Sequence, residues 1–211
     1  MVQAIIYYTD GLIEEPIKSM AWDSIVASGL PISKSTPQDV GGTRGYATMV
    51  KQIIFCLEHS SGDVVFFCEH DCIYPKSHFE FMPTKDIFYY NENVLRWDYP
   101  HNRYISYDRL ISLSGLCVNR KFALDHFKKR LDYITEKGYN DIKGEPDWAR
   151  KMGYEPGTKK IKRGGFSDDD FETWRSAEPI IDIRHKNTFS PPKVTLDSFK
   201  HAPSNWREIR L

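Results

Sequence analysis

The fold expected for this 211-residue chain is decided by residues 62–71, Gly-Asp-Val-Val-Phe-Phe-Cys-Glu-His-Asp. The apolar part, 64–68, does not alternate with polar residues, which is typical of a strand that is buried on both faces of a parallel sheet. Glu69, His70 and Asp71 follow this strand at once. Because ligands bind at the carboxyl ends of strands in open α/β sheets, this acidic tip is a candidate metal or phosphate site.

Strand-like and helix-like segments alternate on the N-terminal side of this stretch. Residues 4–9 are apolar and rich in tyrosine, and apolar residues at helical spacing follow between Ile13 and Ile25. A second amphipathic helix is expected over 46–57, shortly before the strand at 64–68. This repetition predicts right-handed crossovers and an α/β fold, with a mostly parallel central sheet that helices flank.

On the C-terminal side of this stretch, the sequence predicts mainly strands. Strand-like segments rich in aromatic or apolar residues are expected at 79–83, 86–97 and 107–118. An amphipathic helix follows over 124–134, and residues 180–183 indicate a late strand. The region 138–165 contains several glycines and a basic run, and we expect long loops there around a short helix near Pro146.

Composition restricts the class of protein. Lys plus Arg and Asp plus Glu number 29 each, so attraction of the whole molecule to nucleic acid or to an anionic membrane is not indicated. The four cysteines are too few for a disulfide framework and suit reduced, packed thiols. The sequence shows neither a signal-peptide pattern nor a long uninterrupted apolar run, so we expect a soluble, cytoplasmic protein without a membrane span.

The Glu-His-Asp tip has three interpretations. In the first, the tip is a strand end exposed to solvent, as most charged residues are. In the second, it holds Mg²⁺ or Mn²⁺ that bridges to a diphosphate, because hard oxygen donors suit these ions. A zinc site would recruit Cys68, His70 and Cys72, but successive strand side chains alternate between faces, which places His70 on the face away from Asp71. The spacing also differs from that of paired-cysteine zinc sites.

A second polar cluster, residues 182–187, reads Asp-Ile-Arg-His-Lys-Asn. It is either the exposed end of the late strand or part of the same site. In the second interpretation His185 is an imidazole ligand of the metal, while Arg184 or Lys186 offsets the charge of a diphosphate.

Several of these segments together resemble a known family. Residues 44–47 before a helix, the Gly-Asp pair with its apolar strand, and the Glu-His-Asp tip are similar to the nucleotide-sugar half of GT-A glycosyltransferases, especially small bacterial and phage proteins. Thr-Asp at the end of the first strand and residues 114–120 before a helix fit the same pattern. The chain departs from the family's Asp-x-Asp motif at Glu69, which makes Asp71 the main metal candidate.

The resemblance implies a GT-A-like (Rossmann-like) fold in a single domain over 1–211. The nucleotide-binding half would cover about 1–75. The acceptor-side half, about 76–211, would carry a small antiparallel sheet.

The resemblance also implies roles for single residues. The nucleotide would be bound by Thr9, Asp10, Arg44 and Glu69, and Mn²⁺ or Mg²⁺ by Asp71, His185 and Glu69. Glu145 and Asp147 are candidate bases for the acceptor proton; the alternative is an acidic helix start that the helix dipole stabilises. The acceptor would lie against Tyr90, Asn91, Trp97 and Trp174, for which core packing is the alternative.

The function that follows is a metal-dependent glycosyltransferase. It would move a hexose or pentose from a nucleotide sugar, in the first instance a UDP-sugar, to a hydroxyl of a glycan or of a hydroxymethylated nucleic-acid base. For a nucleic-acid acceptor, the basic run 159–163 would bind phosphate. The alternatives are a metal-dependent phosphohydrolase or nuclease, which usually requires more dispersed ligands, and a non-catalytic nucleotide- or carbohydrate-binding module.

Overall fold

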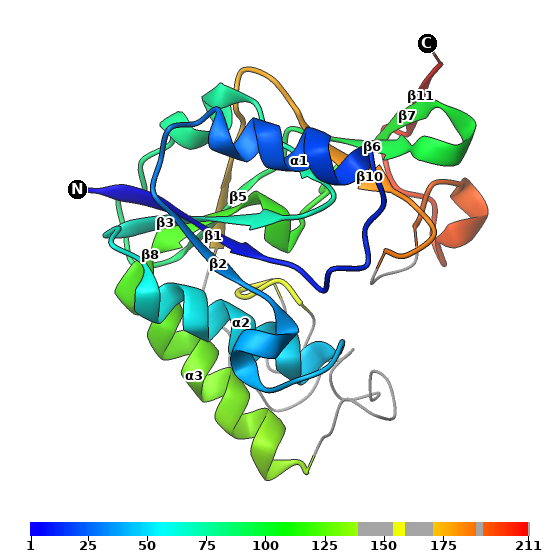
Figure 1. Ribbon diagram of the computed structural model, residues 1–211. Coiled ribbons are helices and arrows are strands. Elements are labelled where there is room, and N and C mark those ends of the chain that lie inside the picture. Colours follow the sequence, from blue (N-terminus) through cyan, green and yellow to red (C-terminus); the bar gives the residue numbers. More distant parts are fainter. Residues whose placement is uncertain (139–153, 159–170, 189–191, 211) are drawn as a thin grey trace.

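The computed structural model describes residues 1–138, 154–158, 171–188 and 192–210 (Figure 1). The central sheet runs in the order β2 (Ile32–Ser35), β1 (Gln3–Tyr8), β3 (Val64–Glu69), β8 (Leu116–Asn119), β5 (Phe88–Asn91) and β9 (Phe171–Trp174). Strand β8 is antiparallel to its neighbours β3 and β5, and the other pairings in this sheet are parallel. The expected α/β class, with a mostly parallel central sheet, is confirmed.

A second, smaller sheet lies beside the central one (Figure 1). Its order is β11 (Arg207–Arg210), β7 (Arg103–Ser106), β6 (Val94–Asp98), β10 (Ile180–Arg184) and β4 (Cys72–Ile73). The pairing of β10 with β6 is parallel, and the remaining pairings are antiparallel.

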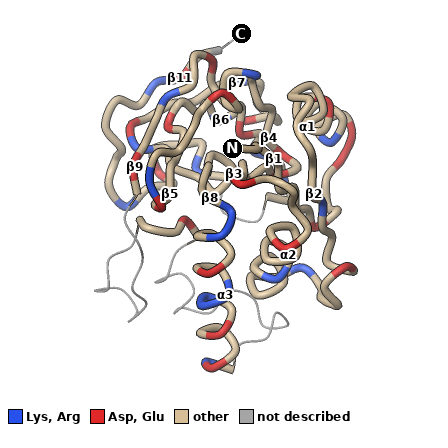
Figure 2. Tube along the Cα trace, turned by 90° about the vertical axis from the view of Figure 1, so that its left-hand side faces the viewer, with Lys and Arg blue, Asp and Glu red and all other residues tan. Residues whose placement is uncertain are grey.

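In the described ranges, three α-helices cover the central sheet. Helix α1 (Ile17–Val26) lies on one side, and α2 (Tyr46–His59) and α3 (Arg120–Glu136) lie together on the other (Figure 1). Short 3₁₀ turns occur at Pro37–Val40, Lys76–Glu80, Tyr99–His101, Leu113–Gly115 and Leu196–Ser198. Acidic and basic residues are interspersed on the outer helix α3 (Figure 2). Among the helices in the described ranges, none has the length and hydropathy needed to cross a bilayer.

Strand β3 is buried from both sides, as its sequence predicts. Val65 and Phe67 pack in the core formed with α2 and α3. Val64 and Phe66 pack in the opposite core, which contains residues of α1 and of the second sheet. Because both faces of β3 contact apolar residues, neither face is exposed to solvent, and the strand therefore lacks alternating polar residues.

The contacts between the starts of β1 and β3 explain why Gly62 and Asp63 precede β3. A Cβ atom on Gly62 would lie 2.7 Å from the Cβ of Ala4, so β1 approaches too closely for a larger residue. The Asp63 carboxylate accepts a hydrogen bond from the backbone N–H of Val2 at 2.9 Å. The two residues therefore fix the start of β1 against β3.

Some expected elements differ from those in the structure. The first helix begins at Ile17 rather than Ile13, directly after Pro16. The segment 79–83 is not a strand, since a 3₁₀ turn occupies Lys76–Glu80. The strand expected over 107–118 shortens to β8, and Arg109, with φ of 59°, interrupts the extended backbone before it.

Candidate metal centre

The candidate site forms where β1 and β3 end side by side. These strands are parallel and in register from Gln3 opposite Val64 to Tyr8 opposite Glu69. The Tyr8 hydroxyl donates a hydrogen bond to Glu69 Oε1 at 2.8 Å. One residue further, Thr9 Oγ1 lies 2.7 Å from His70 Nδ1. The register of the two strands thus brings the polar tip of each into contact with the other.

The second sheet completes the site. His70 and Asp71 form the turn between β3 and β4, and the backbone N–H of Ile183 donates to the carbonyl of Asp71 at 2.8 Å. This bond places the end of β10 beside the turn. His185, the first residue after β10, consequently has its Nε2 atom 3.6 Å from Asp71 Oδ2.

Two groups of side chains in the described ranges are close enough to share a metal ion. One is His70, Asp71 and His185, and the other is Glu69, Asp71 and Cys72; within each group the ligand atoms lie within 4.8 Å of one another. His185 is 8% exposed, and its Nε2 atom has no hydrogen-bond partner in the part of the chain that the structure describes. A separation of 3.6 Å from Asp71 is too long for a hydrogen bond but suits two ligands of one ion. The residues therefore fit a divalent cation.

The two acidic residues of the tip differ in their ionisation. Burial raises the pKa of Glu69 to about 8, and the neighbouring Asp71 carboxylate adds to this shift. Burial also disfavours ionised Asp71, but His185, His70 and Arg184 outweigh it and lower the pKa of Asp71 below its ordinary value. Near neutral pH, Asp71 is the ionised member of the pair, as a cation ligand should be.

Two buried arginines, Arg96 and Arg184, lie near Glu69 and Asp71 and bind Asp182. Asp182 accepts hydrogen bonds from Arg184 Nη1 at 3.0 Å and from Arg96 Nε at 3.2 Å. The positive charge of Arg184 contributes to the lowered pKa of Asp71, so Arg184 lies close enough to act on the site. The alternative candidate, Lys186, pairs with Glu14 through exposed side chains.

Arg44 and Asp10 meet at the rim of the site. Arg44 Nε lies 2.7 Å from Asp10 Oδ2, and Arg44 Nη2 donates to the carbonyl of Asn187 at 2.7 Å. Asp10 Oδ1 also lies 3.8 Å from His70 Nε2. Arg44 therefore connects the end of β1 to the segment that follows His185.

The structure brings six of the residues singled out in the sequence into one cluster: Thr9, Asp10, Arg44, Glu69, Asp71 and His185. The expectation for His70 is wrong, because His70 lies with Asp71 and His185 rather than on the opposite face. Strand β3 ends at Glu69 and a turn follows, so strand alternation does not extend to His70. The sequence did not identify Tyr8 as part of this cluster, although its position opposite Glu69 follows once the register of β1 and β3 is known.

The four residues expected to contact the acceptor are brought together only in part: Asn91 of β5 pairs with Trp174 of β9 beside Tyr90, whereas Trp97 lies in the second sheet. Tyr90 and Asn91 are fully buried. The Tyr90 hydroxyl donates to the carbonyl of Pro156 at 2.7 Å, and the Asn91 side-chain amide donates to Ser176 Oγ at 2.7 Å.

The two tryptophans of that set belong to different sheets. Trp174, at the end of β9, stacks on Phe81 with ring centroids 4.2 Å apart. Trp97, in β6, stacks on Tyr104 at 5.5 Å. The candidate bases Glu145 and Asp147 and the basic run 159–163 lie outside the described residues.

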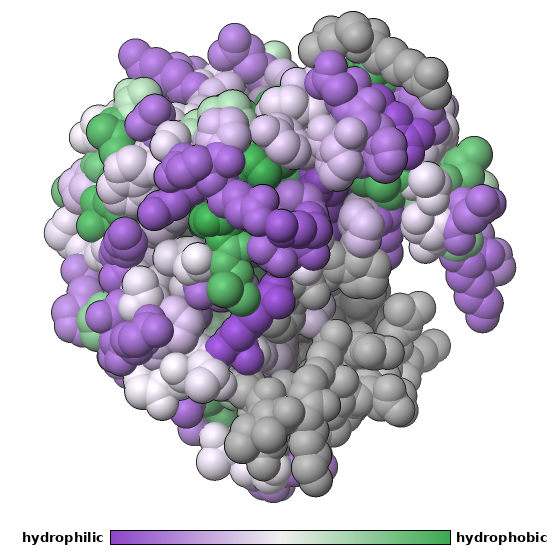
Figure 3. Space-filling model, turned by 45° about the vertical axis from the view of Figure 1, so that its right-hand side comes forward, coloured by the Kyte–Doolittle hydropathy of each residue, from purple (hydrophilic) through white to green (hydrophobic). Residues whose placement is uncertain are grey.

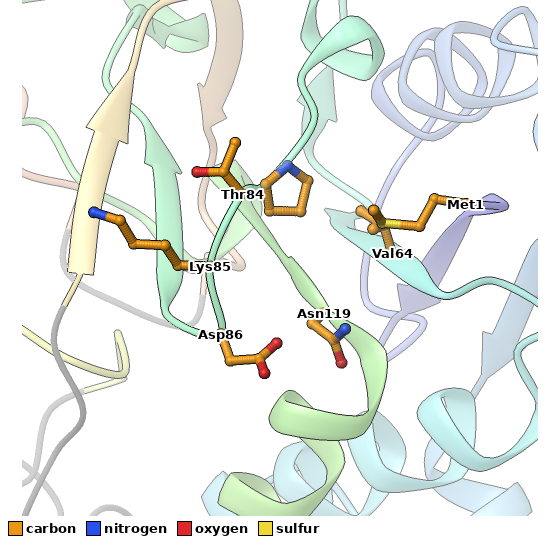
Figure 4. Close-up of a pocket in the computed structure, with 7 residues that line it drawn as sticks. Met1, Val64, Thr84, Lys85, Asp86 and Asn119 are labelled. Carbon is orange, nitrogen blue, oxygen red and sulfur yellow. The ribbon is translucent and has the colours of Figure 1, made fainter.

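A shallow pocket lies at the other end of the central sheet (Figure 4). It is lined by Met1, Val64, Pro83, Thr84, Lys85, Asp86 and Asn119. Met1 precedes β1 and Val64 begins β3, whereas the candidate metal centre lies where these strands end. The pocket and the candidate metal centre are therefore separate.

A scan against protein-family models found no match to this chain, and a search of curated proteins found none either.

Proposed function

We propose that this protein is a metal-dependent glycosyltransferase that uses a nucleotide-sugar donor. The observation that carries the proposal is the convergence of Thr9, Asp10, Arg44, Asp71 and His185 where β1, β3 and β10 end. These residues come from segments far apart in the chain, and the resemblance to GT-A glycosyltransferases assigned each of them to the donor or the metal. The second, mainly antiparallel sheet also suits that family's layout.

Each side chain has a task in such a reaction. Asp71 and His185 would hold a divalent cation, which supplies positive charge where the departing diphosphate becomes more negative. Arg44, at the rim, would bind a phosphate oxygen through its guanidinium group. Asp10, held by Arg44 in the structure, would accept hydrogen bonds from the ribose or base. Arg184, behind Asp71, adds fixed positive charge to the floor of the site.

The acceptor side of the proposal is a hydroxyl group on a polar molecule. Glu145 and Asp147 stay the candidates for taking its proton. Figure 3 shows the molecule turned so that the right-hand side of Figure 1 comes forward. The described residues on this face are mainly hydrophilic, and the hydrophobic residues among them form small areas. Such a surface suits a carbohydrate or another polar acceptor.

Thermal denaturation with UDP, GDP, ADP and CDP, each with and without Mn²⁺, tests the proposal. A ligand present at 100 times its Kd stabilises the folded state by about 2.7 kcal/mol. Relative to the protein with Mn²⁺ alone, we expect the nucleotide to add such a shift, whereas the nucleotide without Mn²⁺ should add none, and we expect Asp71→Asn to abolish the added shift. The matched control is Asp23→Asn, at an exposed position of α1.

The other outcomes separate the competing functions. A chain that responds to none of the nucleotides, with or without metal, would refute the proposal. Binding without transfer or hydrolysis of any nucleotide sugar would identify a binding module instead. Release of inorganic phosphate or cleavage of nucleic acid by the wild type, lost in Asp71→Asn, would identify the phosphohydrolase or nuclease.

A further inference from the structure

We propose that His70 is the third protein ligand of the metal centre, so that two imidazoles and one carboxylate select a transition-metal ion over Mg²⁺. This inference deepens the proposed function, since it concerns the same centre and rests on the same cation. It is tested by metal binding alone, without nucleotide or acceptor.

The first argument is geometric. Ligand atoms of His70, Asp71 and His185 lie within 4.8 Å of one another, close enough to surround a single ion. His70 and Asp71 are adjacent, yet they can serve the same ion because they form a turn rather than a strand. His185 reaches them from β10, whose position is fixed by the bond from Ile183 to the Asp71 carbonyl.

The second argument concerns how the two rings are held. Thr9 Oγ1 lies 2.7 Å from His70 Nδ1 and fixes the orientation of that ring. Metal-binding histidines are generally fixed by a polar partner of this kind. His185 is 8% exposed, and its Nε2 atom, without a hydrogen-bond partner among the described residues, is directed at Asp71. A buried ring nitrogen without such a partner is costly, and an ion would satisfy it.

The competing group, Glu69, Asp71 and Cys72, is less well prepared. Glu69 Oε1 already accepts the hydrogen bond from Tyr8. The Cys72 Sγ atom is a hydrogen-bond donor to Asp71 Oδ1 at 3.9 Å. In that group, therefore, Glu69 and Cys72 are both engaged in hydrogen bonds with neighbouring side chains.

The donor set then determines the ion. Mg²⁺ requires oxygen ligands in a near-ideal octahedron and keeps much of its water. Imidazole nitrogens suit zinc, iron and similar ions, and affinity at such sites rises from Mn²⁺ through Co²⁺. We therefore expect Co²⁺ and Zn²⁺ to bind more tightly than Mn²⁺, and Mg²⁺ to bind most weakly.

The test uses the full chain without an affinity tag, freed of metal by a chelator. Titration with Co²⁺, followed by its visible absorption, gives the affinity, and competition with Mg²⁺, Mn²⁺ and Zn²⁺ gives the order. Pulsed electron paramagnetic resonance of bound Cu²⁺ counts the coordinated imidazoles. We expect two imidazoles in the wild type and one in His70→Ala, with the Co²⁺ affinity of that variant at least about tenfold lower.

Two further variants act as controls. Glu69→Gln should keep the Co²⁺ affinity within a few-fold of wild type, and so should His201→Ala, at an exposed position. If His70→Ala does not fold by circular dichroism, His70→Asn takes its place. Wild-type affinity and an unchanged imidazole count in the His70 variant would overturn the inference, as would equal competition by Mg²⁺.

These experiments test the metal ligands and the glycosyltransferase proposal independently. A two-imidazole centre without any response to nucleotides would support this inference and refute the glycosyltransferase. A Mg²⁺-dependent nucleotide response that His70→Ala leaves intact would do the opposite.

Discussion

Protonation of the buried His78 should make the protein sensitive to acid. His78 is fully buried, and its ring packs against those of Phe66, Phe79 and Trp174. Burial lowers the pKa of His78 from 6.5 to about 3. Between these two values the unfolded chain binds a proton at this site and the folded chain does not. Stability is therefore retained above pH 6.5 and lost as the pH falls towards 3.

The magnitude follows from the size of this shift. Each pH unit below 6.5 costs about 1.4 kcal/mol, so His78 alone should lower the free energy of unfolding by roughly 3 kcal/mol between pH 7 and pH 4. The variant His78→Phe keeps a flat ring and removes the titrating group. Asn91, whose side-chain amide lies 3.2 Å from His78 Nδ1, also donates to Ser176 Oγ and so keeps a partner.

Urea denaturation of wild type and His78→Phe at pH 7 and pH 4 provides the measurement. The loss of stability on acidification should be about 3 kcal/mol smaller in the variant. His126, whose pKa burial lowers to about 2, titrates in both proteins and cancels in the comparison. His201→Phe, at an exposed position, should behave like wild type. Equal acid sensitivity of wild type and His78→Phe would refute the reasoning.

Three further predictions concern the fold and the rim of the site. Asn119→Ala should lower the free energy of unfolding by about 1 kcal/mol in urea denaturation, because the Asn119 side chain accepts hydrogen bonds from two backbone N–H groups of α3; a change smaller than about 0.5 kcal/mol, the range of a neutral surface substitution, would contradict this. Phe67→Ala should cost about 3–5 kcal/mol by the same measurement, since Phe67 is fully buried between β3 and the helices α2 and α3; an unchanged urea midpoint would argue against that packing. Arg44→Gln should weaken nucleoside diphosphate binding, measured calorimetrically with metal present, about tenfold or more while the Co²⁺ affinity stays near wild type; a parallel loss of both would mean that Arg44 maintains the metal centre itself.

The central strand and its polar tip could be predicted because local sequence determines them. The run 64–68 has no polar position, which requires cover on both faces, and the tip must then lie at the strand end. The same reasoning failed for His70, because alternation applies only while the backbone stays extended. Where the chain turns is set by the register of β4 on β10, a contact between distant segments that periodicity does not encode.

The acceptor residues were harder to place for a related reason. A strand such as β5 has two faces, and its sequence alone does not indicate which face another layer will cover. Tyr90 and Asn91 turned out buried on both faces of β5, where their polar atoms bond to Pro156 and Ser176. The polar atoms of a tyrosine or an asparagine can bond to the protein when buried or to a ligand when exposed, so the role of such residues depends on the tertiary arrangement.

The bond from Ile183 to the Asp71 carbonyl has a consequence for assembly of the molecule. Asp71 follows a strand of the central sheet, and His185 follows a strand of the second sheet. An ion shared by them would act as a cross-link that closes a very long chain loop, at an entropic cost that grows only slowly with loop length. Metal loading and packing of β10 against the end of β3 would then be one cooperative event, and a chelator would loosen β10 from the turn that follows β3.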